Sequence, residues 1–357
     1  MTNLLTPYSL TPTITLANRV VMAPTTTKGA TSDGFETPAD LAYYRRRSQA
    51  AGLLITGACL VSPLGEKFTY QMALDSDAKL PGMTRLAEAM HAGHAKAVVQ
   101  LYHAGVNADS AWRKYHQCVG PSARQFHQLD HPVTALDDAG VLQVIQDFAD
   151  ATTRALQAGF DGVELHGAYG HLLQQFFSPY SNQRTDRWAA GPAFSLAVLA
   201  ACKQAAKAAG KPEAIIGYRL TQSETHEDGA GYTIADTLKL IDALADAGIT
   251  YIHATEPTDG PAMRKQIADR CALIVVPGAT DLTTAEAGLA SGDLVALSHA
   301  IVTEPDFASK LAAAKADQLH FTVTSRAQLA DLALPPHMLP WLLGNGPTIQ
   351  GLNTVAG

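Results

Sequence analysis

Three side chains that can donate hydrogen bonds or exchange protons fall close together in the sequence, at His166, Tyr169 and His171. They follow a short apolar run, residues 160–165, which predicts a buried β-strand because Gly159 before it can end a preceding helix. Polar, titratable side chains just past the carboxyl end of a parallel strand occupy the position at which α/β barrels carry out their chemistry. We therefore expect a catalytic site here rather than ordinary loop packing.

Seven further apolar segments predict the strands that must position these residues, at 16–24, 53–61, 95–101, 214–220, 249–254, 272–277 and 294–297. Helical patterns separate them, one starting at Thr37 and others at 82–94, 142–158, 193–210, 233–247, 283–290 and 305–315. Alternating strands and helices in eight units predict a single (β/α)8 TIM barrel over residues 1–357. Residues 102–140 would form a capping insertion after the third strand. Residues 320–357 would form a C-terminal extension that packs outside the barrel or at a subunit contact.

Composition limits the classes of partner. The chain of 357 residues has a formal net charge of −7, and the short basic stretch 45–47 is interpreted as a solvated helical face, so no nucleic-acid partner is expected. No apolar run reaches the roughly 18 residues that a membrane span needs. The N-terminus lacks a charged leader with an apolar core, and the four scattered cysteines form no metal-binding pair. These features predict a cytoplasmic protein without a structural metal.

The segment 160–188 resembles the signature of the Old Yellow Enzyme family of flavin-dependent ene-reductases. The shared pattern is His-Gly-Ala-x-Gly-x-Leu at the strand end, then Gln-Phe, Ser-Pro and Ser-Asn-x-Arg-x-Asp. The resemblance extends over roughly residues 5–315 and implies non-covalently bound FMN and NAD(P)H as hydride donor. It also implies the reaction: hydride passes from flavin N5 to Cβ of an α,β-unsaturated carbonyl compound, and a proton is added at Cα. No Gly-x-Gly-x-x-Gly motif follows a strand, so NAD(P)H is expected to bind only transiently.

The resemblance also implies which residues hold the flavin. Small or hydroxyl residues after the first two strands would lie against the ring, and Gln100 would bond its pyrimidine edge. Arg219, on a buried strand, would face the N1–C2=O edge, although an ion pair with an acidic neighbour is the alternative. Phosphate would bind in the loops after strands seven and eight. The complete cofactor set is Ala23, Pro24, Thr25, Thr26, Ala58, Gln100, Arg219, Gly278, Ser298 and His299.

The chain departs from the family pattern at three places. Tyr169 stands where the family has a carbonyl-binding Asn or His, His171 stands where it has a proton-donating Tyr, and Ser298-His299 replaces Gly-Arg. Two assignments follow. In the favoured one, Tyr169 joins His166 at the carbonyl and His171 protonates Cα, with a rate that falls from about pH 6 to 8. In the other, the phenol remains the acid and His171 only packs. A protonated His299 would replace part of the missing phosphate-binding charge.

Three other functions remain open. A flavin reductase or NAD(P)H oxidase that passes electrons to quinones or O₂ is favoured by the missing Tyr at position 171. A metal-binding barrel would use His166 and His171, but it lacks a third ligand because Glu164 is expected on the opposite face of the strand. A flavin-binding redox sensor without turnover is the third. The sequence leaves open a homo-oligomer and the choice between NADH and NADPH.

Overall fold

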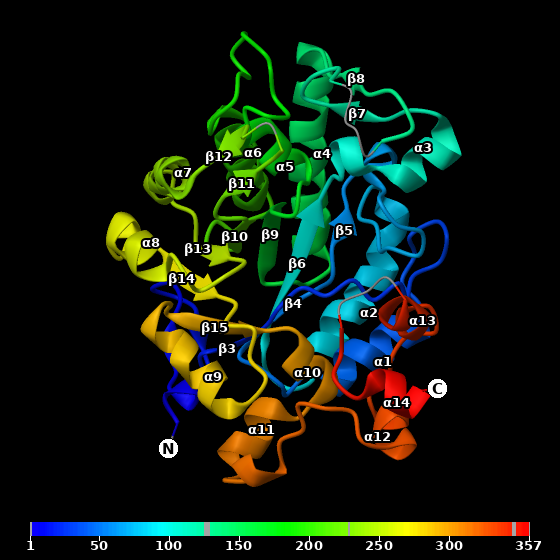
Figure 1. Cartoon of the computed structure of the whole chain (residues 1–357), viewed down its shortest axis with the longest axis vertical. Helices are drawn as coiled ribbons and strands as arrows, with labels where there is room; N and C mark the ends of the chain where they lie inside the picture. Colours follow the sequence, from blue (N-terminus) through cyan, green and yellow to red (C-terminus); the bar gives the residue numbers. More distant parts are fainter. Residues whose placement is uncertain (1, 125–128, 228, 345–347, 357) are drawn as a thin grey trace.

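The computed structural model describes residues 2–124, 129–227, 229–344 and 348–356. Its centre is a closed barrel of eight parallel strands in chain order, which confirms the predicted (β/α)8 fold (Figure 1). The last strand pairs back onto the first, with Val295 opposite Val20. The barrel strands are β3 (Val20–Met22), β4 (Leu53–Ile55), β6 (Lys96–Tyr102), β9 (Gly162–Gly167), β10 (Ile215–Leu220), β13 (Tyr251–Ala254), β14 (Ala272–Val275) and β15 (Leu294–Leu297).

Helices connect the strands and surround the barrel (Figure 1). The first helix begins where the sequence predicts, because Thr37 and Asp40 form a capping box and Pro38 occupies the first helical position. Two of the outer helices, one after β13 and a short one directly after β15, were not predicted from the sequence. The outer helices are α1 (Pro38–Arg46), α2 (Leu80–His91), α4 (Asp138–Gln157), α6 (Ala193–Ala208), α7 (Ile234–Asp246), α8 (Gly260–Ile267), α9 (Leu282–Ala287), α10 (His299–Thr303) and α11 (Phe307–Ala312).

Strand alternation sets which side chains fill the barrel. Val98 and Ile215 lie in an apolar cluster at one end of the interior, beside the hairpin β1 (Tyr8–Ser9) and β2 (Thr15–Leu16). Further along these strands the same face carries polar side chains, Gln100 two residues after Val98 and Arg219 four residues after Ile215. Glu164 lies two residues before His166 and therefore shares its face, and it bonds Gln100 inside the barrel. The expectation that Glu164 points to the opposite face is wrong.

Among its described residues, the insertion after β6 carries a short helix and two short strands that pair in parallel. The Trp112 ring stacks on His131 with ring centroids 4.8 Å apart, while Tyr115 is exposed to solvent. Phe126, in the same insertion, lies outside the described residues. The elements are α3 (Asp109–Tyr115), β7 (Val119–Gly120) and β8 (Thr134–Ala135).

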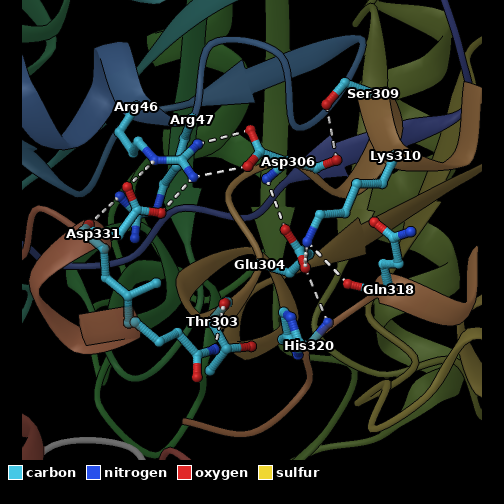
Figure 2. A network of polar contacts seen from close by, with 12 residues as sticks. Arg46, Arg47, Thr303, Glu304, Asp306, Ser309, Lys310, Gln318, His320 and Asp331 are labelled. Carbon is cyan, nitrogen blue, oxygen red and sulfur yellow. Dashed lines mark hydrogen bonds and ion pairs between the residues drawn. The ribbon is translucent and has the colours of Figure 1, made fainter. Parts of the chain in front are cut away.

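Arg46 and Arg47, at the end of the first helix, bind the C-terminal extension through an ion pair and a hydrogen bond (Figure 2). Arg46 forms ion pairs with Asp306 and Asp331, each at 2.7 Å. Arg47 is 0% exposed, and its guanidinium donates to the backbone carbonyls of Tyr43, Val302 and Leu332. The stretch 45–47 is thus not simply a solvated face. The extension contains α12 (Arg326–Asp331), α13 (Met338–Leu343) and α14 (Leu352–Ala356).

Candidate active site

A cavity of about 330 Å³ opens at the carboxyl ends of the barrel strands, a size within the usual range for small-molecule sites. Eleven of its lining residues belong to the sets predicted from the sequence. Four more come from a loop after β5 (Cys59–Leu60) and from the C-terminal extension. The lining comprises Pro24, Thr25, Thr26, Ala58, Lys67, Phe68, Gln71, Gln100, His166, Tyr169, His171, Arg219, Ser298, His299 and Trp341.

His166 and His171 form a close pair in the wall of this cavity. His166 lies near the end of β9, and His171 is the residue before α5 (Leu172–Phe177). Their ring centroids are 4.6 Å apart in an edge arrangement, and the two residues are only 5% and 6% exposed. Both Nδ1 atoms are buried without a partner among the described residues. The pair therefore offers ring nitrogens that no group of the described protein occupies.

Burial sets the charge of both imidazoles. Desolvation lowers the pKa of His166 well below its ordinary value, and the neighbouring His171 lowers it further. Desolvation also lowers the pKa of His171 to about 3, with the charge of Lys67 acting in the same direction. Both rings are thus neutral at pH 7. The expectation that His171 titrates across neutrality is wrong, because the reference pKa applies to a solvated imidazole.

Tyr169 sits at the rim of the cavity in a strained backbone conformation. Its φ of 55° lies in the left-handed region, which costs a non-glycine residue of the order of 1–3 kcal/mol. Its backbone N–H donates to Thr221 Oγ1 at 3.1 Å, and the residue is 56% exposed. Arg219 donates an N–H to the phenol oxygen at 3.3 Å. With that oxygen accepting a bond, the phenol O–H hydrogen remains available to a ligand.

A buried polar network lies beneath the cavity. Gln100 donates through Nε2 to Glu164 at 2.7 Å, and the other carboxylate oxygen of Glu164 is 2.8 Å from His253 Nδ1. Burial opposes ionisation of Glu164, but His253 and Arg219, with the bond from Gln100, outweigh it and lower the carboxyl pKa. An ionised carboxylate only accepts hydrogen bonds, so the Gln100 amide must turn its nitrogen toward it. The Gln100 carbonyl is then left for a ligand.

Arg219 has no acidic partner within 4 Å in the described part of the chain. Its guanidinium donates to Tyr169, and its Nε is buried without a hydrogen bond there. The alternative of a direct buried ion pair is therefore not what the described residues form. A buried arginine with unused donors favours an anionic or acceptor ligand in the cavity.

The first two strands end in the residues predicted to face a ring. Pro24, Thr25 and Thr26 line the cavity, as does Ala58. Ala23 does not. It is fully buried and its backbone N–H donates to the carbonyl of Leu297 at 3.0 Å, so it joins β3 to β15.

Gly57 lies two residues after the end of β4. A Cβ atom there would lie 2.4 Å from the Thr25 carbonyl oxygen. This glycine therefore lets two chain segments approach each other, and it does not itself open space for a ring.

Only two of the three residues predicted to bind the phosphate line the cavity. Ser298 and His299 line the cavity, whereas Gly278 is exposed with φ of 64° and lies outside the lining. Burial lowers the pKa of His299, so the ring is neutral at pH 7. The expected compensation by a protonated His299 is therefore not supported.

Sequence reasoning missed four lining residues, Lys67, Phe68, Gln71 and Trp341. The first three lie in the loop after the second strand. Loops at the carboxyl ends of barrel strands form the active site, so this position was a signal that could have identified them. Trp341 carries no such signal. It reaches the cavity from α13, where its ring lies 6.3 Å from the Phe68 ring and Lys28 Nζ lies within 5.6 Å of both ring centroids. The C-terminal extension thus supplies part of the wall as well as packing outside the barrel.

The residues present fit a flavin mononucleotide. No Asp or Glu is among the described residues that line the cavity, so an anionic phosphate would meet no acidic side chain among them. Arg219 and Gln100 present a donor and an acceptor, which suit the edge of a ring with both N–H and C=O groups. Among the described residues, no group of three or more His, Cys, Asp or Glu is arranged to hold a metal ion. In that same part of the chain, no helix combines the length and apolarity of a membrane span.

Comparison with known proteins identifies the family. The model of the NADH:flavin oxidoreductase / NADH oxidase family matches residues 3–318. The chain is 34% identical to a probable NADH-dependent flavin oxidoreductase of Bacillus subtilis (strain 168), covering 89% of this chain and 90% of that protein. It is 31% identical to an NADPH dehydrogenase of Listeria innocua serovar 6a, covering 87% and 95%. A structure of morphinone reductase in complex with tetrahydroNAD superposes with a TM-score of 0.78 at 28% identity, covering 94% and 97%.

The family match covers the barrel strands and all the predicted site residues, and the cavity lies at the end of the barrel where such enzymes act. The chain therefore belongs to the NADH:flavin oxidoreductase family, that of Old Yellow Enzyme, and is an NAD(P)H-dependent flavin oxidoreductase.

Proposed function

We propose that this enzyme binds FMN non-covalently and reduces the C=C bond of α,β-unsaturated carbonyl compounds. When bound, the flavin would accept a hydride from NAD(P)H and deliver it to the substrate β-carbon. The observation that carries the proposal is the pair of neutral imidazoles, His166 and His171, beside the Tyr169 hydroxyl in one cavity. Such a set can hold a carbonyl oxygen and supply a proton near it.

The flavin would be held by the strand-end residues. Thr26 would donate to the ring near C4=O, Gln100 would accept from its pyrimidine edge, and Arg219 would face the edge where negative charge collects on reduction. The phosphate would meet backbone donors of the two last βα loops. The proposed cofactor contacts are the predicted residues that line the cavity, Pro24, Thr25, Thr26, Ala58, Gln100, Arg219, Ser298 and His299, whereas Ala23 and Gly278 lie outside that lining.

We assign the substrate oxygen to His166 and His171, and the proton to Tyr169. The two imidazoles are closer to each other than His166 is to Tyr169, with ring centroids 4.6 Å apart against 6.0 Å. A neutral imidazole N–H is a good hydrogen-bond donor but a poor acid, whereas a phenol can transfer its proton. The sequence favoured the opposite roles, with Tyr169 at the carbonyl and His171 as the proton donor. We change this assignment because His171 is buried and therefore neutral.

A second function, transfer of electrons to quinones or O₂, is favoured by the exposure of Tyr169. A proton donor that is 56% exposed leaves the cavity open to solvent and to small oxidants. Such acceptors need no proton delivered to carbon, so they would not depend on the phenol.

Two measurements on the purified protein test the proposal. Its visible absorption spectrum should show bound flavin, and denaturation should release FMN. Anaerobic oxidation of NADH or NADPH should then accelerate when cyclohexenone is added. A colourless protein that does not take up FMN would contradict the cofactor assignment. Turnover with O₂ or benzoquinone but none with enones would favour the second function.

A further inference from the structure

The formal cations of the cavity lining are Lys67 and Arg219, because the three histidines that line it are neutral at pH 7. Arg219 already bonds Tyr169 and is assigned to the flavin edge. The Lys67 ammonium makes no ion pair in the described ranges of the chain, and Asp109 acts on it only as a more distant charge. Among the described residues, Lys67 thus places a positive charge without an acidic partner in a cavity with no acidic lining.

The protein anchors the segment that carries Lys67 beside His166 and His171. Its backbone N–H donates to the Tyr102 hydroxyl at 3.2 Å, and that hydroxyl bonds the Gln71 side chain. The Tyr102 ring is fully buried and packs against both histidines, with centroids 5.2 Å from His171 and 6.4 Å from His166. The segment that carries Lys67 is therefore fixed to the same tyrosine that supports the proposed carbonyl-binding pair.

Keeping a partly buried ammonium without a counter-charge costs stability, and the cost is offset when an anion binds. The burial of Lys67 lowers its pKa, which is the sign of that cost. An anion bound here would lie beside His166 and His171, whose pKa values Lys67 also lowers. A carboxylate carried by the substrate itself meets this geometry, since its carbonyl would bond the two imidazoles at the same time.

We propose that Lys67 binds a carboxylate of the oxidising substrate, so that the preferred substrates are α,β-unsaturated carbonyl compounds that carry a negative charge. This inference rests on the proposed ene-reductase function. The anion could instead be a phosphate of NAD(P)H, and the two half-reactions separate these sources. If Lys67 binds a carboxylate of the oxidant, its replacement slows the oxidation of pre-reduced enzyme by that substrate. If it binds a phosphate of NAD(P)H, its replacement affects only the reduction of the enzyme.

The test compares (E)-4-oxopent-2-enoate with its methyl ester, which keeps the enone and lacks the negative charge. In the oxidative half-reaction of the FMN-loaded enzyme, Lys67→Met should lower kcat/KM for the acid by roughly ten- to a hundredfold, the scale of one charged hydrogen bond. The loss should appear mainly in KM, and the ester should change by less than about threefold. Lys67→Arg should restore most of the preference. Lys28→Met, a change on the same aromatic wall but outside the cavity lining, should leave the acid-to-ester ratio unchanged.

Binding without turnover gives an independent measurement. Calorimetry with the saturated product 4-oxopentanoate and its methyl ester should show that Lys67→Met weakens only the acid. Equal losses for acid and ester in either measurement would overturn the proposal and point to proton donation or a structural role. A raised KM for NADPH or NADH with an unchanged acid-to-ester ratio would assign the lysine to the dinucleotide instead. Failure of the wild type to reduce either compound would contradict the proposed function, while the calorimetry would still decide the role of Lys67.

Discussion

The assignment of Tyr169 as the acid predicts a rate of enone reduction that does not depend on pH between about 6 and 8. With its pKa lowered to about 3, His171 would be protonated in about one molecule in a thousand at pH 6 and one in a hundred thousand at pH 8. An imidazolium acid would therefore lose about a hundredfold in rate over this interval. Phenols ordinarily titrate near pH 10, so a phenol acid gives a flat profile.

The assay is stopped-flow oxidation of pre-reduced enzyme by cyclohexenone across this pH range. Tyr169→Phe should slow the reaction by about 10²- to 10⁴-fold at every pH, the usual contribution of a general acid. Oxidation of the same variant by benzoquinone should change by only a few-fold, because no proton is delivered to carbon. The phenylalanine removes the oxygen that accepts from Arg219, so FMN content must be measured in parallel.

Two results would refute this reasoning. A hundredfold fall in the wild-type rate between pH 6 and 8 would mean that an imidazolium is the acid despite its burial. An unchanged enone rate in Tyr169→Phe, together with a large loss in His171→Phe, would return the proton to His171.

Three further predictions concern flavin binding, the cavity wall and the stability of the fold. Arg219→Ala should raise the Kd of apoprotein for FMN by about ten- to a hundredfold, measured by fluorescence quenching, while Arg219→Lys should lose less. Trp341→Ala should raise the KM for cyclohexenone without changing FMN content, and Trp112→Ala, a tryptophan outside the cavity, should change neither. Burial lowers the pKa of His103 to about 4, and its Nδ1 accepts a hydrogen bond from the Gly105 N–H. Between about pH 6.5 and 4 the unfolded chain therefore binds a proton at this histidine that the folded chain does not bind. The free energy of unfolding should therefore fall as the pH falls from about 6.5 to 4, and urea denaturation of His103→Asn should show a smaller fall.

The barrel was predictable because each strand carries its own signal. Short apolar runs between amphipathic helices define the eight units, and closure follows from their parallel order. Local chemistry set details as well, such as the capping box of Thr37 with Asp40. Because the carboxyl ends of barrel strands meet at one end of the barrel, the sequence also predicted that His166, His171 and Arg219 line one cavity, although they come from two strands and a loop.

Charge states were decided only by the tertiary structure. A histidine in the sequence carries a reference pKa, but the charged form loses its water when the ring is buried, and that loss depends on every neighbour. His171 and His299 were expected to carry protons, and both are neutral in the folded chain at pH 7. Glu164 was placed on the wrong face, and the register with Gln100 shows that it belongs to the buried network.

The walls of the cavity were also decided by the fold. Trp341 lies more than a hundred residues after Arg219 in the sequence, and no local pattern points it at the site. It reaches the cavity in a C-terminal extension that Arg46 and Arg47 fasten to α1 and the α10–α11 region. The sequence by itself determined the barrel and the residues at its strand ends, because strand periodicity is local. Contacts between distant segments determined the remaining wall, since their free energy exists only once the chain has folded.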